Sequence, residues 1–240
     1  MPAERFYFDQ LLIPDDRVKL IGPEFHHLVR VMRAQVGDVI ELVNGKNQLA
    51  QAHVYELTKN EAILQVQTVY PNKPTRHPLI LAQALTKLNR LDFILEKGTE
   101  LGVTAFWLFP GDLSIKKDFS SQQMERAQAL TIAAMKQCGR LSLPTIELKP
   151  PLKQWKPQEG ISFFGDVSPT APKFESFKSQ LASQNPILFV TGPESGFSLK
   201  EVEQLRKIHV QGVKLHPFIL RTDTASMMAL SLLSHWLMET

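Results

Sequence analysis

Apolar and polar residues alternate over several short stretches in the first third of the chain. In 62–69, for example, the apolar residues Leu64 and Val66 alternate with polar ones, as is typical of a half-buried strand. Strands are predicted over 5–8, 37–43, 49–57 and 62–69, with a hairpin signal at Asn44-Gly45. Several short strands at this spacing predict a small β-barrel that also carries one helix, over 23–31.

Three prolines within 71–78 separate this part of the chain from the rest. Proline lacks a backbone N–H and is excluded from helix interiors and from central strands. The stretch is therefore interpreted as a linker, and the sequence predicts two domains, 1–72 and 73–240.

Beyond the linker, buried strands and amphipathic helices alternate. The predicted strands are 79–85, 104–109, 145–148, 161–164, 187–190 and 213–215. The predicted helices are 88–101, 120–139, 174–181, 198–208 and 222–238. Ser120 with Gln123, and Ser198 with Glu201, have the spacing of a capping box at a helix start. The fold class predicted by this alternation is α/β, with a mostly parallel sheet covered by helices on both faces.

Two loops of the second domain, 192–198 and 218–225, each connect the end of a predicted strand to the start of a helix. Open α/β sheets bind ligands at such loops. Gly192 and Gly196 allow the backbone to approach a ligand closely. The loop matches neither the dinucleotide-binding motif G-x-G-x-x-G nor the phosphate-binding motif G-x-x-x-x-G-K-[ST]. A tight turn before a capped helix explains the first loop equally well.

Arg221 directly precedes the last predicted helix, for which Thr222 is a candidate N-cap. A cation at the positive end of a helix is unfavourable unless it meets an anion. The sequence therefore favours an anionic ligand near Arg221. An ion pair with a nearby acidic residue such as Asp223 is the alternative.

Composition narrows the class of protein further. Of the 240 residues, 43% are hydrophobic and 21% are charged, with a net charge of +3, which is ordinary for a globular protein. No apolar run has the length of a membrane span, and the N-terminus has no apolar signal core. Cys138 is the only cysteine, so neither an intrachain disulfide nor a cysteine-based zinc cluster can form. A cytoplasmic protein without membrane or metal is expected, with Cys138 in its core.

Basic residues outnumber acidic ones between 73 and 140. Such a segment can present a cationic face to phosphate groups. From the charge alone, a solvated helix surface is the favoured interpretation.

Five segments, in order along nearly the whole chain, resemble the RsmE family, which are 16S rRNA (uracil-N3) methyltransferases of the SPOUT superfamily. The first loop, Gly-Pro-Glu-Ser-Gly-Phe-Ser, resembles that family's G-P-E-G-G-F-S. The other four similar segments are 26–38, 97–103, 133–140 and 215–225. Four positions depart from the family pattern: Ser195 and His216 replace glycines, Phe218 replaces an arginine, and Leu113 lies in a triplet that usually carries charge.

The resemblance implies a PUA-like β-barrel for RNA binding over 1–72 and a SPOUT methyltransferase domain with a trefoil knot over 73–240. It further implies a homodimer that binds S-adenosylmethionine and acts on 16S rRNA or the small ribosomal subunit. The cofactor residues carried over by position are Thr191, Gly192, Glu194, Gly196, Leu215, Ile219, Leu220 and Thr224.

Methyl transfer to uracil N3 requires that nitrogen to lose its proton, which costs roughly 3 kcal/mol if its pKa lies about two units above neutral. A neighbouring cation lowers such a pKa, so Arg221 is the predicted catalytic residue. Candidate RNA contacts are Arg30, Arg33, Lys87, Arg90, Lys97, Arg126 and Arg140. For each of these, a solvated surface charge is an equally good interpretation.

The sequence leaves two other functions to compare with this one. A non-catalytic RNA-binding relative of the same fold is compatible with the charges lost at Phe218 and Leu113. A nicotinamide-dependent enzyme is disfavoured because its glycine fingerprint is absent. The last helix carries an apolar stripe that is most simply interpreted as core and comprises Ala225, Met228, Leu232, Leu233, Trp236 and Leu237. A two-fold interface is what the family resemblance implies, and the periodicity does not distinguish it from core.

Overall fold

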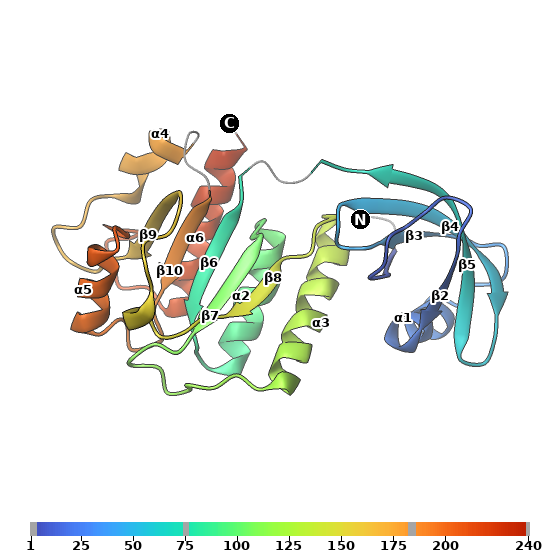
Figure 1. Cartoon of the computed structure of the whole chain (residues 1–240), viewed down its shortest axis with the longest axis horizontal. Coiled ribbons are helices and arrows are strands. Elements are labelled where there is room, and N and C mark those ends of the chain that lie inside the picture. Colours follow the sequence, from blue (N-terminus) through green and yellow to red (C-terminus); the bar gives the residue numbers. More distant parts are fainter. Residues whose placement is uncertain (1–3, 74–76, 182–185, 239–240) are drawn as a thin grey trace. The chain divides into compact units, whose positions relative to one another are not determined.

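The computed structural model describes residues 4–73, 77–181 and 186–238. They form two compact units (Figure 1). The first contains the residues before the linker together with Ile132–Leu143, and the second contains the rest. Residues 74–76 of the predicted linker lie outside the described residues, and the strand before it continues to Pro71.

The first unit is built on a five-stranded sheet in the order β1-β3-β4-β5-β2. Its strands are β1 (Arg5–Tyr7), β2 (Arg17–Ile21), β3 (Val39–Val43), β4 (Gln48–Leu57) and β5 (Glu61–Pro71). All pairs are antiparallel except β1 with β3. The alternation predicted over 62–69 is confirmed, because Ala62, Leu64 and Val66 are fully buried in the core of this unit.

Three details of the first unit differ from the sequence-based prediction. Strand β2 was missed, because it has only two inward-facing apolar residues, Val18 and Leu20. The hairpin at Asn44 is longer than a two-residue turn: Val43 pairs with Leu49, and the Asn44 carboxamide oxygen accepts the N–H of Lys46 at 2.8 Å. The predicted helix over 23–31 is two short pieces, α1 (Gly22–His26) and the π-helical turn η1 (His27–Val31).

Ile132–Leu143, the end of helix α3 (Ser121–Cys138) and the residues after it, belongs to the first unit through specific contacts. Lys136 forms an ion pair with Glu24, with 2.6 Å between Nζ and Oε1. The Arg5 guanidinium donates to the Gly139 carbonyl. The Leu143 N–H donates to the Gly45 carbonyl at 2.8 Å. The first unit is therefore discontinuous in sequence.

The second unit is a six-stranded sheet in the order β11-β9-β10-β6-β7-β8, in which every pair of neighbours is parallel. Its strands are β6 (Leu79–Ala84), β7 (Ala105–Phe109), β8 (Thr145–Leu148), β9 (Ile161–Gly165), β10 (Ile187–Thr191) and β11 (Gln211–Val213). Its helices are α2 (Leu88–Glu100), α3, η2 (Leu152–Gln154), η3 (Phe174–Phe177), α4 (Lys178–Leu181), α5 (Leu199–Lys207) and α6 (Thr222–Leu237). The α/β class with a parallel sheet is confirmed.

Each face of this sheet has its own core. Alternate strand residues such as Leu81, Phe106 and Phe189 pack with α2 and α6 on one face. The intervening residues, such as Ala82 and Val190, pack with α5 and η2 on the other. Helices therefore cover both faces, and the central strands β6 and β10 are buried along their whole length (Figure 1).

The element boundaries show where local patterns decide the structure. Both capping boxes are confirmed: Ser198 exchanges hydrogen bonds with Glu201, and Ser120 with Gln123. The strand predicted over 213–215 is present but misplaced, because β11 spans Gln211–Val213. The next N–H, that of Lys214, donates to the Pro172 carbonyl instead of continuing the sheet. The helix predicted over 174–181 is divided into η3 and α4.

Two predictions about buried side chains need correction. Cys138 is exposed at the end of α3 rather than in the core. In α6, Leu233 and Trp236 are buried as predicted, but Met228 and Leu232 are only partly buried. The fully buried face of α6 begins instead with two polar residues, Thr222 and Ser226.

Helix α2 packs closely against the sheet at Gly98. A Cβ at this position would lie 2.8 Å from two ring atoms of the fully buried Phe106. We therefore expect Gly98→Val to lower the free energy of unfolding by about 1–3 kcal/mol through overpacking, measured as a lower urea midpoint. Ala129→Val, at an exposed position of α3, is the control. Equal midpoints in the two variants would contradict the prediction.

Candidate functional site

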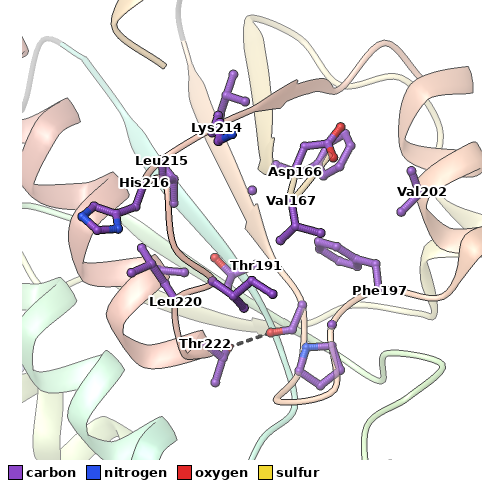
Figure 2. Close-up of a pocket in the computed structure, with 18 of the residues that line it drawn as sticks. Asp166, Val167, Thr191, Phe197, Val202, Lys214, Leu215, His216, Leu220 and Thr222 are labelled. Carbon is purple, nitrogen blue, oxygen red and sulfur yellow. Dashed lines mark hydrogen bonds between the residues drawn. The ribbon is translucent and has the colours of Figure 1, made fainter. Parts of the chain in front are cut away.

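A cavity of about 410 Å³ lies in the second unit, at the carboxyl ends of β9, β10 and β11. Its walls come from the loops that follow these three strands and from the start of α6. Figure 2 shows Asp166, Val167 and Phe197 on one side, Leu215, His216 and Leu220 on the other, and Thr191 between them. The volume falls in the range of small-molecule sites, and the place is where open α/β sheets bind ligands.

The structure brings together most of the residues predicted to bind a cofactor. Those that line the cavity are Thr191, Gly192, Glu194, Gly196, Leu215, Ile219 and Leu220. Thr224 does not line it and is exposed on α6. The two loops singled out in the sequence therefore form parts of a single cavity.

The third loop, after β9, was missed. Asp166 and Val167 line the cavity, but the sequence around them has no glycine motif. The Asp166 carboxylate accepts from the Arg206 guanidinium at 3.0 Å and from the Ser168 N–H at 2.8 Å. Only the strand order, with β9 between β10 and β11, identifies this loop as a wall of the same cavity.

The first loop folds back closely on itself at Gly192. A Cβ there would lie 3.2 Å from the Gly196 carbonyl carbon and 3.3 Å from the Phe197 nitrogen. Gly196 has a φ of +77°, in the region that favours glycine. Ser195 is not among the residues with positive φ, so the serine at this position causes no left-handed strain.

Arg90 connects the two loops of the cavity from the side of α2. Its guanidinium lies 3.2 Å from a carboxylate oxygen of Asp223 and 3.8 Å from one of Glu194. The Glu194 carboxylate also accepts the Lys87 N–H at 3.1 Å, where α2 begins. Glu194 thus lines the cavity, while its carboxylate holds the first loop against α2.

Burial alone would raise the pKa of Glu194, but the nearby Thr86 hydroxyl, the Lys87 N–H and the Arg90 cation lower it below its ordinary value. A carboxyl group with a lowered pKa in the folded state stabilises the fold above its unfolded-state pKa. That stability is lost as the pH falls through the lowered value.

We therefore expect Glu194→Gln to lower the melting temperature at neutral pH and to reduce the further loss on acidification below about pH 4.5. Thermal melts over a pH series measure both effects. Glu203→Gln, at an exposed position of α5, is the control. Parallel pH curves for Glu194→Gln and the unaltered protein would contradict the assignment.

Arg221 occupies the N-cap position of α6, and its side chain is exposed. Among the described residues, its guanidinium has no hydrogen bond or ion pair. The alternative pairing with Asp223 is wrong, because that carboxylate is bound to Arg90. Thr222 is the first residue of the helix rather than its cap, and its hydroxyl donates to the Gly192 carbonyl at 2.7 Å (Figure 2).

The candidate RNA contacts of the second unit differ in whether they already form ion pairs with acidic side chains. Lys97 contacts Glu96 and Glu100, both at 2.8 Å, and hydrogen bonds to these carboxylates raise its pKa to about 12. Arg126 pairs with Asp92 at 2.8 Å. Arg90 joins the two loops as described above. Lys87, at the start of α2, is exposed.

In the first unit, Arg30 and Arg33 are exposed in and just after η1. Arg140 is partly buried, and burial lowers its pKa. Its guanidinium donates to the Ser142 hydroxyl at 3.0 Å. Arg30 and Arg33 are therefore the more accessible of the candidate cations in this unit.

No helix in the described parts of the chain is long and apolar enough to cross a membrane. The described residues also contain no group of three or more His, Cys, Asp or Glu side chains arranged to hold a metal ion.

Family models match both units. An RNA methyltransferase domain matches residues 72–234, and an RNA methyltransferase PUA domain matches residues 20–67. The chain is 29% identical to ribosomal RNA small subunit methyltransferase E of Bacillus subtilis, over 90% of this chain and 89% of that protein. It is 26% identical to the protein of the same name from Rickettsia conorii, over 96% and 95% of the two chains.

Similar solved structures point to the same family as these sequence matches. Ribosomal RNA small subunit methyltransferase E from Neisseria gonorrhoeae, bound to S-adenosylmethionine, is 26% identical with a TM-score of 0.87, over 98% of each chain. A putative methyltransferase from Legionella pneumophila in complex with the same cofactor has a TM-score of 0.90, with 98% of each chain covered. At 24% identity, the second likeness shows the fold.

The fold, the cavity and the matching models define an RNA methyltransferase that uses S-adenosylmethionine. The chain belongs to the RsmE family of small-subunit ribosomal RNA methyltransferases. The family resemblance, the SPOUT-type and PUA-like fold class and the cofactor are confirmed. The order and pairing of the strands do not show whether the chain is knotted, so the trefoil knot stays a prediction.

Proposed function

We propose that this protein transfers a methyl group from S-adenosylmethionine to N3 of a uridine in 16S rRNA. The observation that carries the proposal is that both predicted loops line one cavity, in a chain of this family. Its relatives are named for the small-subunit ribosomal RNA.

The cavity fits the cofactor in size and chemistry. Val167, Leu215 and Leu220 provide apolar walls that suit a purine ring. The close turn at Gly192, where a Cβ would meet backbone atoms of Gly196 and Phe197, sets the course of the loop that forms one wall. These residues, with Thr191, Gly196 and Ile219, would hold S-adenosylmethionine, whose sulfonium supplies an electrophilic methyl group.

Arg221 supplies the charge that the uridine needs. Its guanidinium is exposed and, among the described residues, unpaired, and it lies between the cavity-lining residues Leu220 and Thr222. A cation close to the base lowers the N3 pKa by about one to three units. That range covers most of the roughly 3 kcal/mol needed to ionise N3 at neutral pH. Arg221 is therefore the catalytic residue of the proposal.

The rest of the proposal concerns RNA and assembly. Residues 1–72 act as a PUA-like RNA-binding domain and 73–240 as the methyltransferase domain, in the cytoplasm. The exposed cations Arg30, Arg33 and Lys87 meet phosphates of 16S rRNA, alone or in the small subunit. The active form is a homodimer. The partly exposed apolar side chains of α6, such as Met228 and Leu232, support a two-fold contact.

The test is methylation in vitro. The purified protein is incubated with S-adenosylmethionine and with either free 16S rRNA or small subunits, both from cells that lack this gene. Mass spectrometry of the digested nucleosides should then show 3-methyluridine. Cofactor binding without any methylated uridine would instead support a non-catalytic RNA-binding protein. Absence of cofactor binding would overturn the proposal.

A further inference from the structure

A buried polar cluster lies beneath the loops of the cavity. We call it the polar hub, and it comprises the side chains of Gln83, Thr191, Thr222 and Ser226 and the carbonyl of Gly192. Gln83 and Ser226 are fully buried, and Thr191 and Thr222 are each 6% exposed. Gln83 is in β6, Thr191 ends the neighbouring strand β10, and Thr222 and Ser226 begin α6.

Gln83 is at the centre of this hub. Its amide nitrogen lies 3.0 Å from the Thr222 hydroxyl oxygen and 3.3 Å from the Gly192 carbonyl oxygen, and donates to both. Its carbonyl oxygen accepts from the Ser226 hydroxyl at 2.7 Å. Ser226 is also hydrogen-bonded to the Thr191 hydroxyl at 3.1 Å. One side chain on a rigid central strand thus holds the first loop and the start of α6.

Burial makes this arrangement specific. A buried polar group without partners costs free energy, whereas a fully bonded network favours one geometry. The other residues of β6 are Leu79, Ile80, Leu81, Ala82 and Ala84, all apolar and buried. An apolar residue at position 83 would therefore satisfy the sheet. The amide nitrogen also donates to the Ala84 carbonyl of its own strand at 3.0 Å, and the other hydrogen bonds of the side chain are to the loop and helix that it joins.

We propose that Gln83 and Ser226 are positioning residues of the S-adenosylmethionine site. Neither lines the cavity, and both act through Thr191, Gly192 and Thr222, which do. They set the separation between the first loop and the start of α6, and so the width of the cavity before the cofactor enters. The proposal rests on the proposed function, because it assigns the hub to that cofactor.

The experiment compares Gln83→Leu and the milder Ser226→Ala with the unaltered protein. Losing hydrogen bonds that hold both loops should raise the Kd for S-adenosylmethionine about tenfold or more in Gln83→Leu, as measured by calorimetry. At saturating cofactor, kcat should stay within about twofold. Amide hydrogen exchange in the free protein should become faster in the first loop and at the start of α6.

Thr99→Val is the matched control, because it also removes a fully buried hydroxyl, from α2 and outside the cavity. It should lower the melting temperature and leave the Kd unchanged. In the double variant of Gln83 and Ser226, the loss of binding free energy for S-adenosylmethionine should be less than the sum of the two single losses. The reason is that the two side chains are hydrogen-bonded to each other.

A folded Gln83→Leu protein with the Kd and the loop exchange rates of the unaltered protein would overturn the proposal. If Gln83→Leu does not fold, the same two measurements on Ser226→Ala decide. If the unaltered protein binds no cofactor, the proposed function fails. The exchange rates of the free variants then still show whether the hub orders the two segments.

Discussion

Replacing Arg221 by alanine should lower the turnover of uridine methylation by about 10- to 1,000-fold. This is the loss expected when a cation that lowers the N3 pKa by one to three units is removed. The Kd for S-adenosylmethionine should change by less than about twofold, because Arg221 does not line the cavity. Single-turnover rates at saturating cofactor and RNA, together with calorimetry, measure the two quantities.

The pH profile separates this role from a structural one. Without the cation, N3 ionises at a higher pH, so the rate of Arg221→Ala should keep rising with pH after that of the unaltered protein has levelled off. Arg221→Lys should retain part of the activity because it keeps the charge. Lys207→Ala, an exposed cation at the end of α5, is the control. Unchanged turnover in Arg221→Ala would exclude Arg221 as the catalytic residue.

Gly192→Ala should raise the Kd for S-adenosylmethionine about tenfold or more. The added Cβ would lie 3.2 Å and 3.3 Å from backbone atoms of Gly196 and Phe197, and a backbone cannot turn aside as a flexible side chain can. The loop must therefore shift, and the cavity wall shifts with it. Calorimetry with the cofactor measures the change.

Gly102→Ala provides the comparison for this variant. Gly102 has a φ of +87° and lies outside the cavity, and an added Cβ there would have no atom within 4 Å. Its substitution should cost about 1–2 kcal/mol of stability through backbone strain and leave cofactor binding unaltered. Tight cofactor binding by Gly192→Ala would show that the close approach at Gly192 is not required.

The sequence predicts those parts of the fold in which local pattern and packing agree. The capping boxes at Ser120 and Ser198 begin helices as expected, because a cap depends only on residues three positions apart. Strand β2 was missed, because its five residues include two charged ones that face solvent. The end of β11 was misplaced, because the Pro172 carbonyl that binds the Lys214 N–H is distant in sequence.

The candidate site shows the same division. The two loops were identifiable from their glycines and from the strands before them, and both line the cavity. Asp166 was not identifiable, because strand order decides which loops are neighbours. Gln83 left a visible signal, a single amide in a strand that is otherwise apolar. Its partners in the first loop and α6 are more than one hundred residues away, so the sequence does not reveal them.

The sequence also did not predict which of the basic residues form ion pairs. Arg90, Lys97 and Arg126 were indistinguishable in the sequence from the other candidate RNA contacts. In the structure they have acidic partners at Asp223, Glu100 and Asp92. An arginine already bound to a carboxylate must give up that contact before it can meet a phosphate.

The inclusion of Ile132–Leu143 in the first unit has a consequence for synthesis. When the ribosome has made only the segment before the linker, Glu24 still lacks Lys136 and Arg5 still lacks the Gly139 carbonyl. Domains generally fold as units, the N-terminal one first. Here the earlier unit is complete only after the first segment of the later one, Thr75–Thr131, has been translated. Maturation of the two domains on the nascent chain is therefore interleaved.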